Sequence, residues 1–259
     1  MDEFLGREVF LGPFISEPSP TFVGQAVFNG CVAFCNWSRE DVARVLPVDL
    51  ELAVNASRAP GLHPLVFIFG EQTEGATIFG GVTFPLGVRY HEFGIAIPFV
   101  KYRRGQYLHT FVPLMCSSYF PATWAGNTHY GFSKIMASMW WTDSMFVMTR
   151  PDGALLFHGT VEPTSDWFPG IHCELPNFAG MRSIFDLPIL GRRENGTFVQ
   201  SHFGWDYTEA RVRAARSAVS IDAALAEGLT PRICTSLRSA TFEVQRMTWR
   251  LSWPAYREP

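Results

Sequence analysis

The lysines are the first residues of chemical interest, because the chain has 21 cationic side chains and only two of them, Lys101 and Lys134, are lysines. Lys134 lies in an aromatic segment, residues 127–137, that carries no other formal charge. Arginine keeps its charge at any working pH, whereas a lysine in an apolar site can lose its proton and attack a carbonyl carbon as an amine. Lys134 is therefore a candidate for covalent catalysis through a Schiff base. The structural alternative is a lysine whose stem lies along an apolar surface with its ammonium group in water.

The composition indicates a globular chain without a nucleic-acid or membrane partner. Of its 259 residues, 47% are hydrophobic and 17% charged, so we expect a sizeable core and a single domain over residues 1–259. A net charge of −3 argues against a surface for nucleic acid or anionic lipid. The N-terminus lacks the basic start and apolar core of a signal peptide, and no apolar run is long enough to span a membrane. We therefore expect a cytoplasmic protein.

The sequence shows no motif for a metal or a cofactor. The cysteines form no CxxC pair and the histidines are dispersed, so we expect buried, unpaired thiols and no zinc site. There is also no phosphate-binding glycine loop, nucleophile elbow or dinucleotide fingerprint. We therefore expect catalysis, if present, to need no metal and no cofactor.

The elements that must position Lys134 are mostly β-strands. Apolar, β-branched or aromatic segments separated by turn residues predict strands at residues 23–37, 65–69, 82–90, 94–101 and 107–114. The capping-box pattern from Ser38 to Asp41 predicts a short helix that ends before Pro47.

In the second half, a Pro-Asp-Gly turn at residues 151–153 predicts a hairpin between strands 145–150 and 154–159. Another strand is expected at 197–205, after a turn at 193–196. Residues 209–221 alternate as a strand does, although their alanine content also favours a helix; we predict a strand, then a short helix at 222–227.

The last strand is predicted at residues 241–253, with a change of phase near Gln245 and Arg246. Its inward side chains would be Phe242, Val244, Met247, Trp249, Leu251 and Trp253. Together these elements predict an α+β protein, mainly antiparallel β, whose curled sheet closes into a cone-like barrel with a central cavity and a few short helices. Such a cavity suits a small ligand.

Three short segments in register resemble the acetoacetate decarboxylase superfamily. They are the strand Tyr90-His-Glu92-Phe-Gly, the strand Gly105-Gln-Tyr-Leu-His109, and the segment Gly131-Phe-Ser-Lys134. In that family the corresponding segments are a Tyr-x-Glu strand, a Gly-x-Tyr strand and a Gly-Phe/Tyr-Pro-Lys segment that bears the Schiff-base lysine. The similarity extends over about residues 25–140. It implies that Lys134 forms an iminium and that Glu92 moves protons, whereas the structural alternative for Glu92 is a solvent-facing strand carboxylate or a partner of Arg89.

The resemblance also implies the residues that contact a substrate. Tyr107 and His109 share one strand face, and one of them could offer a hydrogen bond to a substrate oxygen, although an aromatic or satisfied core position is the more common explanation for either. Asn127 and His129 lie on the approach to Lys134. The full set of candidate substrate contacts is Phe28, Tyr90, Tyr107, His109, Asn127, His129 and Phe132.

The sequence also departs from the decarboxylase pattern. Ile135 stands where decarboxylases carry a second lysine, and Ser133 replaces their proline. Residues 126–128 read Gly-Asn-Thr instead of Gly-Arg-Glu, and Phe28 falls near the place of the arginine that meets the substrate carboxylate. The loss of these charged groups points away from acetoacetate and toward branches of the superfamily that use the iminium for aldol condensation and dehydration.

Three functions are therefore compatible with the sequence. The favoured one is a Schiff-base lyase that acts on a keto acid or related carbonyl compound through Lys134. Decarboxylation of a 3-keto acid is the rival within that class. A non-catalytic barrel that binds a hydrophobic small molecule is the alternative outside it. The resemblance and the aromatic stretch from Trp249 to Tyr256 also imply a homo-oligomer, although core packing explains that stretch equally well.

Overall fold

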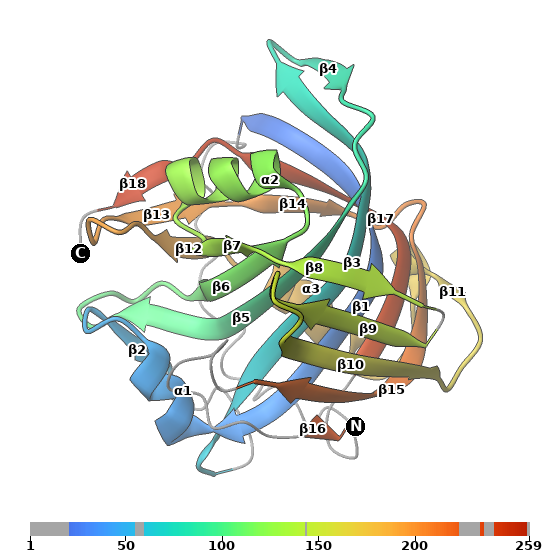
Figure 1. Cartoon of the computed structure of the whole chain (residues 1–259). Coiled ribbons are helices and arrows are strands. Elements are labelled where there is room, and N and C mark those ends of the chain that lie inside the picture. The colour runs from blue at the N-terminus through green and yellow to red at the C-terminus, as the bar shows by residue number, and fades with distance from the viewer. Residues whose placement is uncertain (1–20, 55–59, 143, 223–233, 236–240, 258–259) are drawn as a thin grey trace.

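The structure is a computed structural model that describes residues 21–54, 60–142, 144–222, 234–235 and 241–257 (Figure 1). The expected helix at residues 222–227 lies outside the described residues, apart from Asp222. Among the helices described, none is long and apolar enough to cross a membrane.

The chain folds mainly into β-strands, with a few short helical segments. The helical segments are α1 (Arg39–Val45), α2 (Phe120–Ala125), the π-helical turn η2 (Gly126–Tyr130), the 3-10 turn η3 (Gly170–His172) and α3 (Phe178–Phe185). The strands of the first half are β1 (Phe22–Ser38), β2 (Leu50–Leu52), β3 (Leu62–Phe79), β4 (Val82–Pro85), β5 (Tyr90–Tyr102), β6 (His109–Ser117), β7 (Lys134–Met136), β8 (Ser138–Trp141) and β9 (Met145–Thr149). Those of the second half are β10 (Leu155–Pro163), β11 (Phe168–Pro169), β12 (Ile189–Arg192), β13 (Phe198–Ser201), β14 (Phe203–Asp206), β15 (Arg211–Ile221), β16 (Cys234–Thr235), β17 (Thr241–Ser252) and β18 (Ala255–Arg257).

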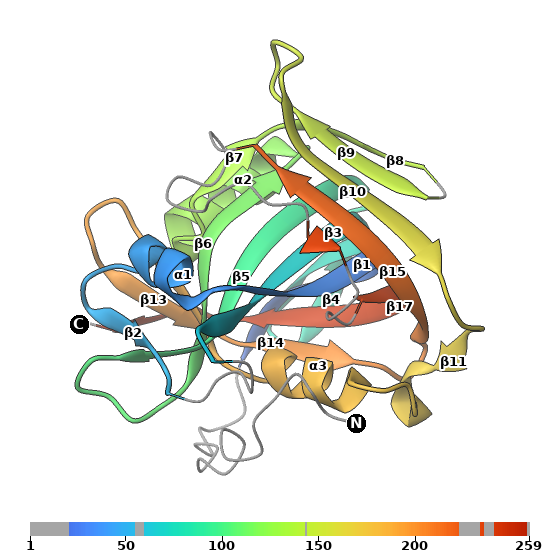
Figure 2. The ribbon, with the colours of Figure 1, turned by 90° about the horizontal axis from the view of Figure 1, so that it is seen from below.

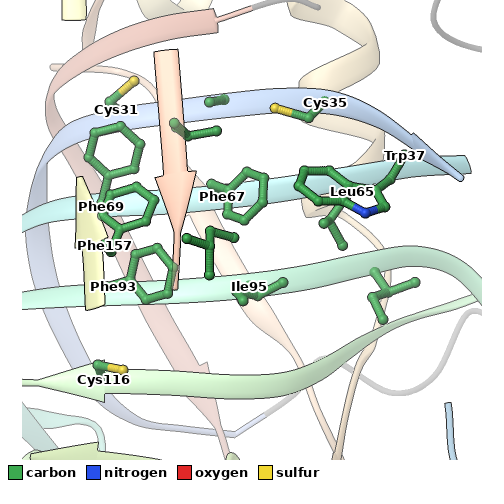
Figure 3. Packing of buried hydrophobic residues seen from close by; sticks show 14 of the residues in the cluster. Cys31, Cys35, Trp37, Leu65, Phe67, Phe69, Phe93, Ile95, Cys116 and Phe157 are labelled. Carbon is green, nitrogen blue, oxygen red and sulfur yellow. The ribbon is translucent and has the colours of Figure 1, made fainter. Parts of the chain in front are cut away.

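The long strands β1, β3, β5 and β6 form the centre of the sheet, and both of their faces are buried. Successive side chains of a strand point to opposite faces. In β3, Phe67 and Phe69 therefore join one apolar cluster, while Val66 joins another on the other face. Figure 3 shows the first cluster, in which Phe67, Phe69, Phe93 and Phe157 pack beside three buried cysteines. Burial on both faces explains why these segments are nearly continuous apolar runs.

The two clusters lie between the central strands and different parts of the chain. The cluster of Figure 3 is closed by β8, β9, β10 and β15, which pair in that order, while the other cluster is covered by α3 and β14 (Figure 2). β17 pairs with β1, β14 and β15 and so connects the two sides. The second cluster contains Phe28 and Phe132, and it borders the candidate site.

The prediction of a mainly antiparallel sheet with few short helices is confirmed, whereas its closure into a cone-like barrel is not. The sheet is mixed, because β6 pairs in parallel with both β7 and β12. The described strands also do not close into a barrel. β6 pairs with β7, whereas β9 pairs with β8, a separate strand that begins after Ala137, so the ladders do not form one continuous ring.

Several local predictions are confirmed. Ser38 caps α1 by accepting a hydrogen bond from the Asp41 backbone, and the hairpin of β9 and β10 forms around residues 151–153. Residues 211–221 are a strand. The predicted change of phase in β17 occurs at Arg246, where φ is 52° and the register with β1 shifts.

Three local predictions are wrong. Trp253 is 64% exposed, because it follows the end of β17 and leaves the sheet. The expected strand at residues 82–90 ends at Pro85, since Gly87 adopts a φ of 63°. The expected strand at 107–114 begins only at His109, and Tyr107 lies on the surface before it.

Candidate active site

Lys134 and Glu92 form a buried ion pair across three adjacent strands. Lys134 opens β7 beside Met115 of β6, and Glu92 of β5 lies opposite Ser117 of the same β6. The two side chains meet with 2.5 Å between Lys134 Nζ and Glu92 Oε1, and they are only 8% and 11% exposed. Because the two groups are in contact and largely shielded from water, a proton can pass directly between Lys134 Nζ and the Glu92 carboxylate.

The second oxygen of Glu92 accepts a hydrogen bond from Gln72, whose own side chain is held by Trp249. Gln72 Nε2 donates to Glu92 Oε2 at 3.2 Å, and Trp249 Nε1 donates to Gln72 Oε1 at 2.8 Å. An indole N–H is only a donor, so it fixes the amide of Gln72 with its oxygen toward Trp249 and its NH2 group toward Glu92. This arrangement orients one carboxylate oxygen and leaves the other for Lys134.

The backbone of Lys134 is clamped by Asn127. The Asn127 side chain accepts from Lys134 N at 2.5 Å and donates to Lys134 O at 2.8 Å. The chain turns between these residues through Gly131, with φ of 65°, and Ser133, with φ of 48°. Proline is restricted to φ near −65° and could not adopt the backbone of Ser133. The serine at position 133, where decarboxylases carry proline, therefore allows a turn that proline could not form.

Gly126, where α2 meets η2, leaves space for the Lys134 stem. A Cβ atom at this position would lie 2.6 Å from Lys134 Cδ and 2.9 Å from Cε. Its φ of −59° and ψ of −44° suit any residue, so glycine is required by the contact and not by the backbone. Figure 1 shows α2 leading to β7, which places this contact at the entrance of the lysine strand.

We expect Gly126→Ala to retain stability and lose reactivity at Lys134. Alanine is the better helix former by about 1 kcal/mol, but its methyl group displaces the lysine stem, and a shift of about 1 Å can reduce a rate by about 100-fold. The measurement is the rate of borohydride trapping of a ketone on Lys134, with thermal unfolding as the control. A trapping rate equal to that of the unmodified protein would show that the stem tolerates the displacement.

The ion pair opens into a cavity of about 210 Å³. Among the described residues that line it, Lys134 and Glu92 alone carry a formal charge. The remaining wall is mostly apolar and comes from both halves of the chain: Phe28, Val66, Ile68, Gln72, Tyr90, Gly94, Ile95, Ala96, Thr110, Val112, Met115, Ala122, Ala125, Gly126, Tyr130, Phe132, Ile184, Phe185, Ile189, Phe203, Trp205, Trp249 and Leu251.

Two neighbours of the pair stay protonated. Burial, and then the charge of Glu92, raise the pKa of Tyr90 well above its usual value. The same causes in the same order raise the pKa of the Cys116 thiol to about 12. Tyr90 is thus a neutral phenol in the cavity wall, and Cys116 is a buried thiol behind it rather than a nucleophile.

The structure brings together some of the predicted contact residues. Phe28, Tyr90 and Phe132 line the cavity beside Lys134 and Glu92. Asn127 is exposed and does not line it, since its side chain is engaged by the Lys134 backbone.

Three predicted contacts lie elsewhere. Tyr107 is 47% exposed on the surface. His129 is exposed, with its ring against Trp124 at a centroid distance of 5.4 Å. His109 is buried outside the cavity, where Nε2 lies 3.3 Å from Gln200 Oε1. The strand begins at His109 instead of Tyr107, so the expected pairing of these two side chains on one strand face does not occur.

The wall also contains residues that the sequence did not reveal. Gln72 and Thr110 are the buried polar ones, and Ile184 and Phe185 come from α3. Trp205 comes from β14. Trp249 and Leu251 were predicted to face inward from the last strand, and this periodicity is the one signal that could have placed them in the wall.

The sequence matches no protein-family model and no curated protein. Its fold, however, is similar to solved structures. The enduracididine biosynthesis enzyme MppR, in complex with the condensation product of pyruvate and imidazole 4-carboxaldehyde, matches with a TM-score of 0.59 at 10% identity, over 94% of this chain and 91% of that one.

Acetoacetate decarboxylase from Legionella pneumophila matches with a TM-score of 0.59 at 12% identity, over 94% of this chain and 93% of that one. An acetoacetate decarboxylase-like enzyme from Sphingomonas wittichii RW1 matches with a TM-score of 0.57 at 12% identity, over 95% and 98%. The chain therefore has the acetoacetate decarboxylase-like fold, as the sequence resemblance predicted.

Proposed function

We propose that this chain is a Schiff-base-forming lyase that acts on a carbonyl compound through an iminium on Lys134, with aldol condensation and dehydration as its chemistry. The observation that carries the proposal is the buried pair of Lys134 and Glu92 at the wall of an apolar cavity. A lysine amine needs a base to become a nucleophile, and Glu92 touches its Nζ atom.

The first half-reaction needs only this pair. Glu92 takes a proton from the Lys134 ammonium group, and the free amine attacks the carbonyl carbon to give a carbinolamine. Glu92 then returns the proton to the departing hydroxyl group, which leaves as water. The products are a cationic iminium and a carboxylate, so the charge of the site is the same before and after.

The second half-reaction uses the iminium as an electron sink. The Glu92 carboxylate removes a proton from the adjacent carbon, and the C–H electron pair moves toward nitrogen to give a neutral enamine. The enamine carbon adds to an aldehyde, and the aldehyde oxygen takes the proton that Glu92 holds. Glu92 then removes the second hydrogen of the same carbon and passes it to the departing hydroxyl group, which leaves as water and gives the unsaturated product as an iminium. Hydrolysis of the iminium then restores Lys134. The condensation product of pyruvate and an aldehyde that is bound to MppR supports a condensation reaction by analogy of fold.

Decarboxylation of a 3-keto acid is the less favoured alternative. It would use the same iminium, but the substrate carboxylate must be held beside it until carbon dioxide leaves. The described cavity wall offers no cation besides Lys134, and Phe28 is apolar. Acetoacetate is therefore expected to be a poor substrate.

The test is borohydride reduction with small carbonyl compounds. We expect acetone or pyruvate plus borohydride to add a mass increment that maps to Lys134, and either donor with benzaldehyde to give a condensed, dehydrated product. Acetoacetate serves as the comparison for carbon dioxide release. Rapid release with no condensed product would favour the decarboxylase, and the absence of any increment on Lys134 would favour a non-catalytic binding protein.

A further inference from the structure

We infer that the cavity selects an uncharged, aromatic or bulky aliphatic ketone or aldehyde and disfavours keto acids. The inference rests on the proposed function, since it names the substrate class of the same site. It is carried by the charge balance of the cavity and by its aromatic wall.

The charge of the cavity is already balanced without a ligand. Lys134 and Glu92 are the charged groups of the described wall, and they neutralise each other at 2.5 Å. Formation of the iminium keeps the positive charge on the lysine nitrogen, so Glu92 remains its counter-ion. A substrate carboxylate would add a second negative charge with no second cation, and an unpaired buried charge is strongly unfavourable.

Part of the cavity wall is a connected set of aromatic rings. Trp205 lies 4.7 Å from Phe185 and 5.5 Å from Phe203 between ring centroids, both in stacked arrangements. Phe203 in turn contacts Trp249 at 5.4 Å and Phe132 at 6.5 Å. All five residues line the cavity. Offset and edge contacts with aromatic rings favour a flat apolar ligand.

The test compares two ligands that differ only in charge beside the same carbonyl: 4-phenylbutan-2-one and 2-oxo-4-phenylbutanoate, in which a carboxylate replaces the ketone's methyl group. Calorimetry measures binding, and borohydride trapping measures iminium formation on Lys134. We expect the ketone to bind at least about tenfold more tightly than the keto acid. Equal or tighter binding of the keto acid, or no binding of either compound, would overturn the inference.

The two readouts separate this inference from the proposed function. Preferential binding of the ketone without trapping would support the cavity's selectivity while contradicting the Schiff-base mechanism. Tight binding and efficient trapping of the keto acid would support the Schiff-base mechanism and contradict the inferred selectivity of the cavity.

A variant tests the cause of the selectivity. In Glu92→Gln the iminium or ammonium group of Lys134 has lost its counter-ion. We therefore expect the binding affinity for the keto acid, relative to that for the ketone, to rise at least about tenfold. The matched control is Glu51→Gln, which removes the partner of Lys101 at 2.9 Å, outside the cavity, and should leave the preference unchanged. An unchanged preference in Glu92→Gln would contradict the charge-balance argument.

Discussion

Lys134→Arg is expected to abolish turnover and borohydride trapping while the protein stays folded. Arginine keeps the positive charge beside Glu92, so the buried ion pair is preserved and no unpaired carboxylate is left behind. A guanidinium group is protonated at every working pH and forms no iminium with a ketone. Loss of the covalent step should reduce the rate to that of the uncatalysed reaction, whereas the thermal unfolding midpoint should change by only a few degrees.

Lys101→Arg is the control for this prediction, since Lys101 is the only other lysine of the chain. It also forms an ion pair, with Glu51 at 2.9 Å, but its side chain is 28% exposed and lies outside the cavity. We expect the control variant to keep the turnover and the borohydride trapping of the unmodified protein. Turnover that persists in Lys134→Arg and falls in Lys101→Arg would transfer the covalent role to the other lysine, and turnover that persists in both would remove the Schiff base from the mechanism.

The central residues of the site could be predicted from sequence because their signals are local. The segment Gly131-Phe-Ser-Lys134 and the strand carrying Tyr90 and Glu92 are short, contiguous patterns. Because successive side chains of a strand alternate, His91 is expected on the opposite face from Glu92, and His91 does not line the cavity. These patterns could not give the distance between Lys134 and Glu92, because that distance depends on β6 lying between their two strands.

The partners of Glu92 could not be predicted, since they depend on register between distant strands. Gln72 lies beside Glu92 because β3 pairs with β5 so that Gly70 is opposite Glu92 and Gln72 opposite Tyr90. A shift of one residue would send the Gln72 side chain to the other face. Nothing near Gln72 in the sequence specifies this register, so a buried glutamine looks like any polar strand residue until the pairing is known.

The same limit explains why His109 remained a candidate substrate contact, whereas the structure shows the core position that was its alternative. The sequence predicted a strand from Tyr107 on, with both side chains on one face and either a substrate contact or a core position for each, but β6 starts at His109. The buried ring of His109 then meets Gln200 on β13, a strand that the first half of the sequence cannot reveal. The sequence predicted this strand correctly, but it could not predict the residue at which the strand begins or how the strand lies against the second half of the chain.

Glu92→Gln tests the proton transfers of both half-reactions, and we expect it to slow exchange at the substrate carbon by about 10²–10⁴-fold, the usual contribution of a positioned general base. Glutamine keeps the shape of the side chain and an oxygen that can accept from Gln72 Nε2, so the wall should stay intact. The measurement is exchange of the α-hydrogens of 4-phenylbutan-2-one with deuterated solvent, followed by mass spectrometry. Glu71→Gln is the matched control, because Glu71 pairs with Arg89 and does not line the cavity. Exchange at the original rate in Glu92→Gln would show that Glu92 is only a structural counter-ion of Lys134. Another group of the cavity wall would then carry the proton, and the Tyr90 phenol is the titratable wall group nearest to Glu92 in sequence.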